Sequence, residues 1–168
     1  MSAEDAPALP DAPLAVLDTS VLLSSHRHWL WLLAHLGHYR GVWSTFIVGE
    51  LVRIRVEHSI RLRVPRAIYR QRINQLIHLL SDVLLVADYR SAMASGLLKD
   101  PDDEPVLATA LAAHAEIIVS LNTRDFPAGR EAAGVRFLTP QEFLAFLESN
   151  EAGDQARTSA ADAGRQVP

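Results

Sequence analysis

The sequence contains no cysteine among its 168 residues. Disulfides, thiolate nucleophiles, iron–sulfur clusters and thiolate zinc sites are therefore excluded, and any metal must be held by oxygen or imidazole. Long hydrophobic runs are also missing, because the longest one, Trp29–Leu36, is interrupted by His35 and falls far short of the roughly 20 residues that cross a bilayer. Residues 1–13 carry neither a basic residue nor an apolar run. We therefore expect no secretory signal, no membrane contact and a cytoplasmic protein.

Lysine is nearly absent, since Lys99 is the single lysine among 16 basic residues. The net charge of −4 argues against a nucleic-acid binder when the chain is averaged as a whole. The average hides a basic stretch, residues 53–72, in which seven arginines face one acid, Glu57, for a local charge of +6. These arginines are Arg53, Arg55, Arg61, Arg63, Arg66, Arg70 and Arg72. Positive charge is thus concentrated in one segment of a mildly acidic chain.

The length and composition fit one domain with a hydrophobic core. Residues 1–13 and 150–168 are small, polar and rich in alanine, so we expect them to be disordered tails that flank a folded unit of residues 14–149.

Short apolar runs without polar alternation are typical of strands that are buried on both faces of a parallel sheet. They predict strands over residues 14–17, 83–87, 116–120 and 135–138. The predicted helices cover residues 29–36, 45–56, 66–80 and 105–114, and a last helix begins at Thr139, Pro140 and Glu142, which form a capping-box pattern. Strands that alternate with helices predict a single α/β domain in which helices flank a central, mostly parallel sheet.

Carboxylates stand where the predicted strands end, which is where α/β domains bind ligands. Asp18 follows the first strand, whereas Asn122 and Asp125 follow the strand 116–120. Asp103 belongs to the acidic cluster 100–104, ahead of a compact apolar helix. Such acids can also be helix caps or turn formers, so each has a purely structural interpretation.

Glu50 lies between apolar residues of a predicted helix, near its buried face. Buried carboxylates are rare unless they are paired or bound to a metal.

Four segments of the chain resemble the PIN-domain nucleases and, within them, the VapC-like ribonuclease toxins of prokaryotic toxin–antitoxin modules. They are Val16–Leu23, Trp43–Leu51, Asp100–Ala110 and Ile118–Pro127, which leads into Thr139–Phe143, and they occur in the order of the family. Together they span nearly the whole predicted folded unit.

The resemblance implies that four acids form the PIN site: Asp18, Glu50, Asp103 and Asp125. The chain departs from a common family pattern at Ser120, where threonine is frequent, and at Asn122, where many members have aspartate. Either Asp125 or Asn122 completes the site, and we favour Asp125 because a neutral amide is a weaker ligand for a hard cation.

Oxygen ligands of this kind suit Mg²⁺ or Mn²⁺, which would relieve the repulsion between the carboxylates, activate a water molecule and screen the phosphate. We expect Asp18, Asp103 and Asp125 to be the metal ligands and Glu50 to orient or deprotonate the attacking water. Supporting hydrogen bonds are expected from Thr19 or Ser20, which would orient Asp18, and from Ser120 and Asn122.

An acidic pocket repels RNA, so basic groups elsewhere must hold the substrate. Arginine suits this task because its planar guanidinium binds phosphate and stacks on unpaired bases. The predicted RNA contacts are Arg53, Arg61, Arg63 and Arg66. The same stretch could instead be a solvated helix face, or it could bind the acidic segment of an antitoxin. The family also implies a homodimer.

The predicted function is therefore a divalent-metal-dependent endoribonuclease that is the toxin of a type II toxin–antitoxin module. The main alternative is a catalytically weak or inactive PIN-like module that binds RNA or protein. Phosphotransfer through an aspartyl-phosphate at Asp18 fits less well, because Ser20 stands where a further acid is usual and Lys99 precedes the acidic cluster.

Overall fold

The computed structural model describes residues 12–68, 70, 71, 74, 84–86, 88–93 and 96–151. These residues form one six-stranded sheet in the order β3-β2-β1-β4-β6-β5. The strands are β1 (Leu14–Leu17), β2 (Arg40–Ser44), β3 (Leu84–Val86), β4 (Ile117–Val119), β5 (Glu131–Ala132) and β6 (Val135–Leu138). All neighbouring strands are parallel except β5 and β6, which are antiparallel. The predicted fold class, a single α/β domain with a mostly parallel sheet, is confirmed.

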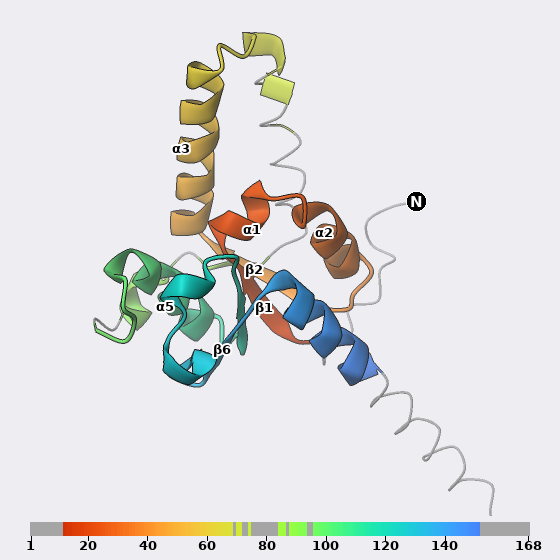
Figure 1. The fold of residues 1–168 in the computed structure, drawn as a ribbon, viewed down its shortest axis with the longest axis vertical. Coiled ribbons are helices and arrows are strands. Elements are labelled where there is room, and N and C mark those ends of the chain that lie inside the picture. The colour runs from red at the N-terminus through yellow and green to blue at the C-terminus, as the bar shows by residue number, and fades with distance from the viewer. Residues whose placement is uncertain are drawn as a thin grey trace, which may run out of the picture.

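Helices cover both faces of the sheet (Figure 1). The α-helices are α1 (Thr19–Leu23), α2 (Arg27–His35), α3 (Thr45–Arg61) and α5 (Glu104–Ala112), and a further helix covers residues 140–151. Short 3₁₀ turns are η1 (Arg90–Ala92), η2 (Pro101–Asp103), η3 (Thr123–Asp125) and η4 (Ala128–Arg130). In Figure 1, α5 lies on one side of the sheet, α2 and the helix of residues 140–151 lie on the other, and α3 stands out from the body.

The last helix begins with the predicted capping box. The Glu142 carboxylate accepts hydrogen bonds from the Thr139 backbone N–H, at 2.8 Å, and from its hydroxyl, at 2.9 Å. The Glu142 N–H in turn donates to the Thr139 hydroxyl at 3.3 Å. These bonds hold the pKa of Glu142 below its usual value, because they stabilise the ionised carboxylate. The capping-box prediction is confirmed.

Two strands were not predicted from the sequence, β2 and the short β5. In β2 only Val42 and Trp43 have strand-forming side chains, and the strand forms because it is enclosed between β1 and β3. The helix α3 was predicted to end near residue 56, but it continues to Arg61. The apolar periodicity fades where α3 leaves the sheet, but no proline or glycine stands between residue 56 and Pro65 to end the helix earlier.

Parts of four predicted segments lie outside the described residues, namely both tails, the helix 66–80 and the strand 83–87, of which residues 84–86 are described as β3. Residues 66–68, 70, 71 and 74 are helical, and the rest of the predicted helix 66–80 is not described. Most of the two predicted tails, residues 1–11 and 152–168, is likewise outside the described part, while residues 150 and 151 continue the last helix.

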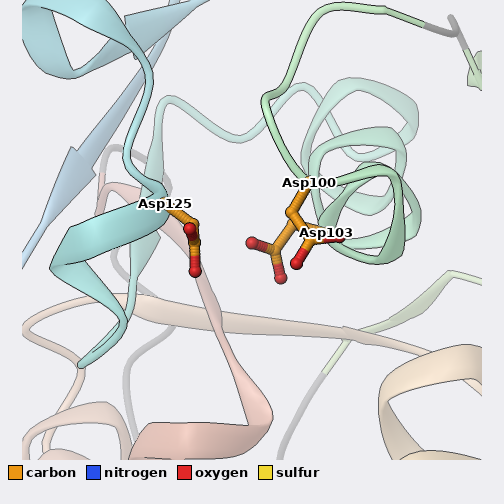
Figure 2. Close-up of side chains that lie close together, drawn as sticks. All are labelled: Asp100, Asp103 and Asp125. Atoms are coloured by element: carbon orange, nitrogen blue, oxygen red, sulfur yellow. The ribbon is translucent and has the colours of Figure 1, made fainter.

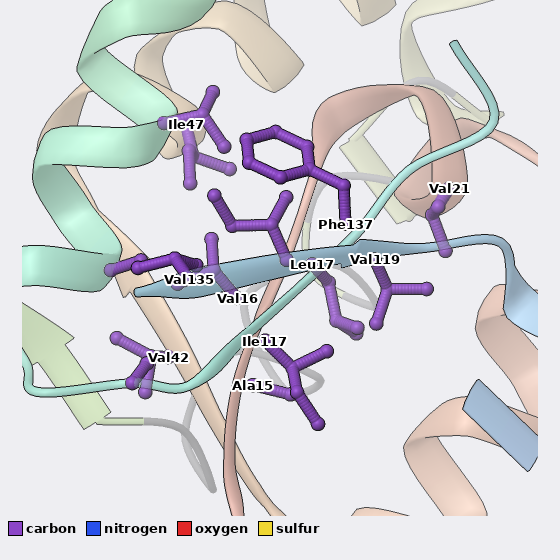
Figure 3. Packing of buried hydrophobic residues seen from close by; sticks show 14 of the residues in the cluster. Ala15, Val16, Leu17, Val21, Val42, Ile47, Ile117, Val119, Val135 and Phe137 are labelled. Atoms are coloured by element: carbon purple, nitrogen blue, oxygen red, sulfur yellow. The ribbon is translucent and has the colours of Figure 1, made fainter. Parts of the chain in front are cut away.

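The core lies along the central strands and beneath the flanking helices (Figure 3). Val16 and Ile118, on the two central strands, are at most 1% exposed. On the α2 side, the Tyr39 ring packs edge-on against Phe143, with 5.0 Å between ring centroids, and its hydroxyl donates to the Leu30 carbonyl at 2.9 Å. The central strands are thus fixed by packing from both sides.

The strand order creates a switch point between β1 and β4. The chain moves from β1 outward through β2 to β3, and then returns to the other side of β1 to form β4. The Asp18 N–H donates to the Val119 carbonyl at 3.0 Å, so the pairing continues to the carboxyl ends of both strands. In open parallel sheets this position, where neighbouring connections diverge, is where ligands bind.

Candidate metal centre

Three carboxylates converge beside this switch point. Each of Asp100, Asp103 and Asp125 contributes one oxygen, and these oxygens all lie within 4.8 Å of one another. Figure 2 shows Asp125 reaching in from η3, while Asp100 and Asp103 face it from the opposite side. All three residues are half-buried. A single cation could contact all three carboxylates without a long reach by any of them.

Asp18 is not one of these three, but from the end of β1 it lines a pocket together with Asp103 and Asp125. It occupies the N-cap position of α1, yet its side chain makes no capping hydrogen bond. Its Oδ2 atom instead accepts hydrogen bonds from the Ser20 hydroxyl, at 2.6 Å, and from the Ser120 hydroxyl, at 2.7 Å. The capping interpretation therefore does not explain the Asp18 carboxylate, which two hydroxyls from different strand ends hold in position.

The carboxylates of Asp103 and Asp125 are not used for helix capping either. Asp103 is the N-cap residue of α5 but makes no side-chain cap bond. Asp125 accepts a hydrogen bond from the Asn122 side-chain amide at 2.6 Å. Asn122 thus uses its amide nitrogen to orient Asp125, and this arrangement favours Asp125 over Asn122 as the residue that completes the site.

Glu50 stands slightly apart from this pocket. Its Oε2 atom accepts a 2.6 Å hydrogen bond from Thr19, whose side chain is buried. Thr19 therefore supports Glu50, while Ser20 is the residue that supports Asp18. Glu50 lines an adjoining groove rather than the pocket of Asp18, Asp103 and Asp125. It is still close enough for its charge to act on Asp103.

The surroundings of Asp103 disfavour the ionised form of its carboxyl group. Burial, followed by the negative charges of Asp18, Asp100, Asp125 and Glu50, raises the pKa of Asp103 from 3.8 to about 6. Each of these effects disfavours the ionised carboxylate. A bound cation would oppose the effect of the neighbouring charges and favour the ionised carboxylate.

Asp100 is the carboxylate whose position the sequence interpretation missed. It was recognised only as one member of an acidic cluster, although a signal was present in the spacing. Side chains at positions i and i+3 eclipse one another in a 3₁₀ turn. Because η2 is such a turn, Asp100 and Asp103 face the same space, while the Asp102 side chain lines the adjoining groove. Asp100 also caps η2 by accepting a hydrogen bond from the Asp102 N–H at 3.0 Å.

The remaining acid of the cluster, Glu104, has a structural role. It is 7% exposed, and its carboxylate accepts a hydrogen bond from the Gly96 N–H at 2.6 Å. Glu104 therefore anchors the preceding loop to α5 and thereby helps to fix the position of η2.

The four predicted RNA-binding arginines are not gathered at one place. Arg53 lines the groove next to Glu50 and pairs with Glu57 at 3.1 Å. Arg61 lies about 12 Å farther along α3. Arg63 and Arg66 line a separate depression beyond it. All four are exposed, and only Arg53 adjoins the carboxylates.

The carboxylate donor set fits a hard divalent cation such as Mg²⁺ or Mn²⁺, because the converging group contains neither imidazole nor thiolate. The fold and site together define an α/β domain with a carboxylate centre at the switch point of its sheet. The PIN domain family matches residues 15–124, well over half of the chain. The protein belongs to this family, which has a nuclease fold and whose members generally use divalent metals.

No match to the chain is found among curated proteins or among solved structures. Within the described residues, no helix has the length and hydrophobicity needed to cross a membrane.

Proposed function

We propose that the protein is a divalent-metal-dependent endoribonuclease. The convergence of Asp100, Asp103 and Asp125 beside Asp18 carries this proposal. Two of the predicted ligands, Asp18 and Asp103, occupy helix N-cap positions without capping, so helix stability does not account for their carboxylates. This arrangement also favours the enzyme over an inactive PIN-like binding module, for which a cluster of repelling charges would have only a cost.

In this proposal Asp18, Asp103 and Asp125 hold Mg²⁺ or Mn²⁺, and Asp100 is added to the predicted ligands. The ion would supply Lewis-acid stabilisation of the phosphate and would lower the pKa of a water molecule. Ser20 and Ser120 orient Asp18, whereas Asn122 orients Asp125. Glu50, which Thr19 holds at the edge of the pocket, orients the attacking water or accepts its proton.

The arginines of α3 and the following segment supply the attraction that the carboxylates lack. Arg53 is placed to act nearest the reaction, because it shares a groove with Glu50. Arg61, Arg63 and Arg66 lie farther out and would contact more distant phosphates of the RNA. Contacts of this kind give affinity and salt dependence rather than sequence preference.

The decisive variant is Asp18→Asn. Its amide oxygen can still accept the hydrogen bonds of Ser20 and Ser120, so the fold should persist while the negative charge is lost. We expect the cleavage of a labelled RNA in Mg²⁺ or Mn²⁺ to fall at least about 100-fold, and EDTA to abolish cleavage by the parent protein. Glu116→Gln, an exposed carboxylate at the other end of the sheet, is the matched control and should cleave normally. A folded Asp18→Asn protein that cleaves as fast as the parent would refute the mechanism.

We further propose that the enzyme is a VapC-like toxin that acts in the cytoplasm, forms a homodimer and is inhibited by an antitoxin. The order of the four motifs supports this narrower assignment. Induced expression of the parent protein in a bacterial host should arrest growth, whereas expression of Asp18→Asn to the same level should not. Co-expression of the protein encoded by the neighbouring gene should restore growth. Equal growth arrest by both proteins would contradict a toxin that acts through cleavage.

A further inference from the structure

A groove adjoins the carboxylate pocket on the side of Glu50. One wall is α3, which contributes Gly49, Glu50 and Arg53. The other wall is formed by Tyr89 and Arg90 together with the segment around Asp102. Asp102 of the groove is the chain neighbour of Asp103 in the pocket, and the charge of Glu50 acts on Asp103, so the groove lies next to the pocket.

The Arg90 guanidinium is presented to this groove. It lies over the ring of Tyr89, 5.8 Å from the centroid, and Tyr89 is itself 7% exposed and packs against Phe46. Contact with a ring face leaves the N–H groups at the edge of the guanidinium available for hydrogen bonds. The buried ring therefore holds a cation at the groove without consuming its donors. The sequence pattern predicts no RNA contact in this part of the chain.

Gly49 is the second indication that a ligand comes close. It lies inside the helix α3, where glycine is less favourable than alanine. Its backbone does not require glycine, because its φ is not positive, and a Cβ atom built there would meet nothing within 4 Å. Packing among the described residues thus gives no reason for glycine. A ligand that approaches the helix backbone from the groove would give one.

We propose that this groove binds the RNA nucleotide next to the scissile phosphate, with Arg90 contacting its phosphate and Gly49 allowing the strand to lie against α3. The inference rests on the proposed function, because it assumes that the carboxylate pocket acts on RNA. A single strand suits the groove, since one wall is a helix surface and the other a short turn. Arg90 and Arg53 offset the repulsion that Glu50 and Asp102 exert on the incoming phosphate.

The test measures binding separately from cleavage. A short labelled single-stranded RNA is titrated, in EDTA and over a range of salt concentrations, into full-length Asp103→Asn protein, in which one repelling carboxylate has been removed. Adding Arg90→Ala should weaken binding roughly tenfold and lower the slope of log affinity against log salt by about one. Arg90→Lys should restore the slope. Arg40→Ala, an exposed arginine at the opposite end of the sheet, should leave both unchanged.

Gly49→Ala gives the sharper signature, because its two effects have opposite signs. We expect a higher melting temperature, since alanine favours the helix, together with weaker RNA binding. A purely structural glycine would not separate the two measurements in this way.

The outcomes distinguish the two proposals. If the parent cleaves RNA while the Arg90 and Gly49 variants bind it as tightly as their background, the groove assignment is wrong and the nuclease stands. If the parent cleaves no RNA but binding depends on Arg90 and Gly49 as expected, the groove assignment stands and the enzyme proposal fails. Absence of any RNA binding would overturn both.

Discussion

The Asp103→Asn protein is expected to lose RNA cleavage by at least about 100-fold while melting, in EDTA at pH 7, at a temperature no lower than that of the parent. The loss of activity follows from removing a predicted metal ligand. The retained or raised stability follows because Asp103 is half-buried among like charges, and its side chain makes no capping bond that the substitution would break. Cleavage assays and thermal unfolding of the same preparations measure the two effects.

The pH dependence of the parent sharpens this prediction. The pKa of Asp103 is raised to about 6 from 3.8, so the folded protein binds a proton that the unfolded chain has released. This contribution to stability is present at low pH and is lost as the pH rises through about 6. Between pH 5 and 7 the metal-free parent should therefore lose stability relative to Asp103→Asn, and added Mg²⁺ should restore it at pH 7 in the parent alone.

Asp102→Asn is the matched control. Asp102 is the neighbouring acid of the same turn, but it is exposed and lines the adjoining groove. Its substitution should leave the stabilisation by Mg²⁺ in place. If Asp103→Asn were strongly destabilised in EDTA, or if Asp102→Asn also abolished the response to Mg²⁺, the electrostatic account of the site would be wrong.

A strand or helix could be predicted from the sequence where the residues of that segment alone indicate its secondary structure. The strands 14–17 and 135–138 have the predicted bounds, because their apolar side chains pack into or against the core. By contrast, β2 is recognisable only from its neighbours: Arg40 and Gly41 are poor strand formers, and burial between two strands overrides their preference. The five-residue helix α1 is too short to show a helical period.

For the candidate site, the sequence indicated which acidic residues to consider. Asp18 and Asp125 became candidates because they follow buried strands, whose ends topology brings together, whereas their roles in a site were implied only by the family resemblance. The hydrogen-bond partners of these acids could not be predicted from the sequence. Whether Thr19 or Ser20 contacts Asp18 depends on the direction of each side chain at the start of α1. In the structure the Ser20 hydroxyl donates to Asp18, whereas the Thr19 hydroxyl donates to Glu50.

Phe143→Ala is expected to lower the free energy of unfolding by about 3–5 kcal/mol, although the family match ends before this residue at 124. Phe143 is fully buried on the helix of residues 140–151, where its ring contacts Tyr39 and Phe146. Burial also raises the pKa of Tyr39, which shows how thoroughly water is excluded there. Removing the ring would leave a cavity beneath Tyr39 that this close packing cannot fill. Denaturant unfolding with linear extrapolation measures the loss.

The expected loss decides whether the last helix is part of the domain or an appendage to it. The predicted folded unit, residues 14–149, includes this helix, whereas the family match covers only the first four-fifths of that unit. Leu144→Ala on the same helix is the control, because Leu144 is 36% exposed and its truncation should cost only about 1 kcal/mol or less. A loss for Phe143→Ala that is no greater than this would mean that the helix adds little to the core. A large loss would mean that the helix is an integral part of the core, which also includes β4 and its neighbour β6.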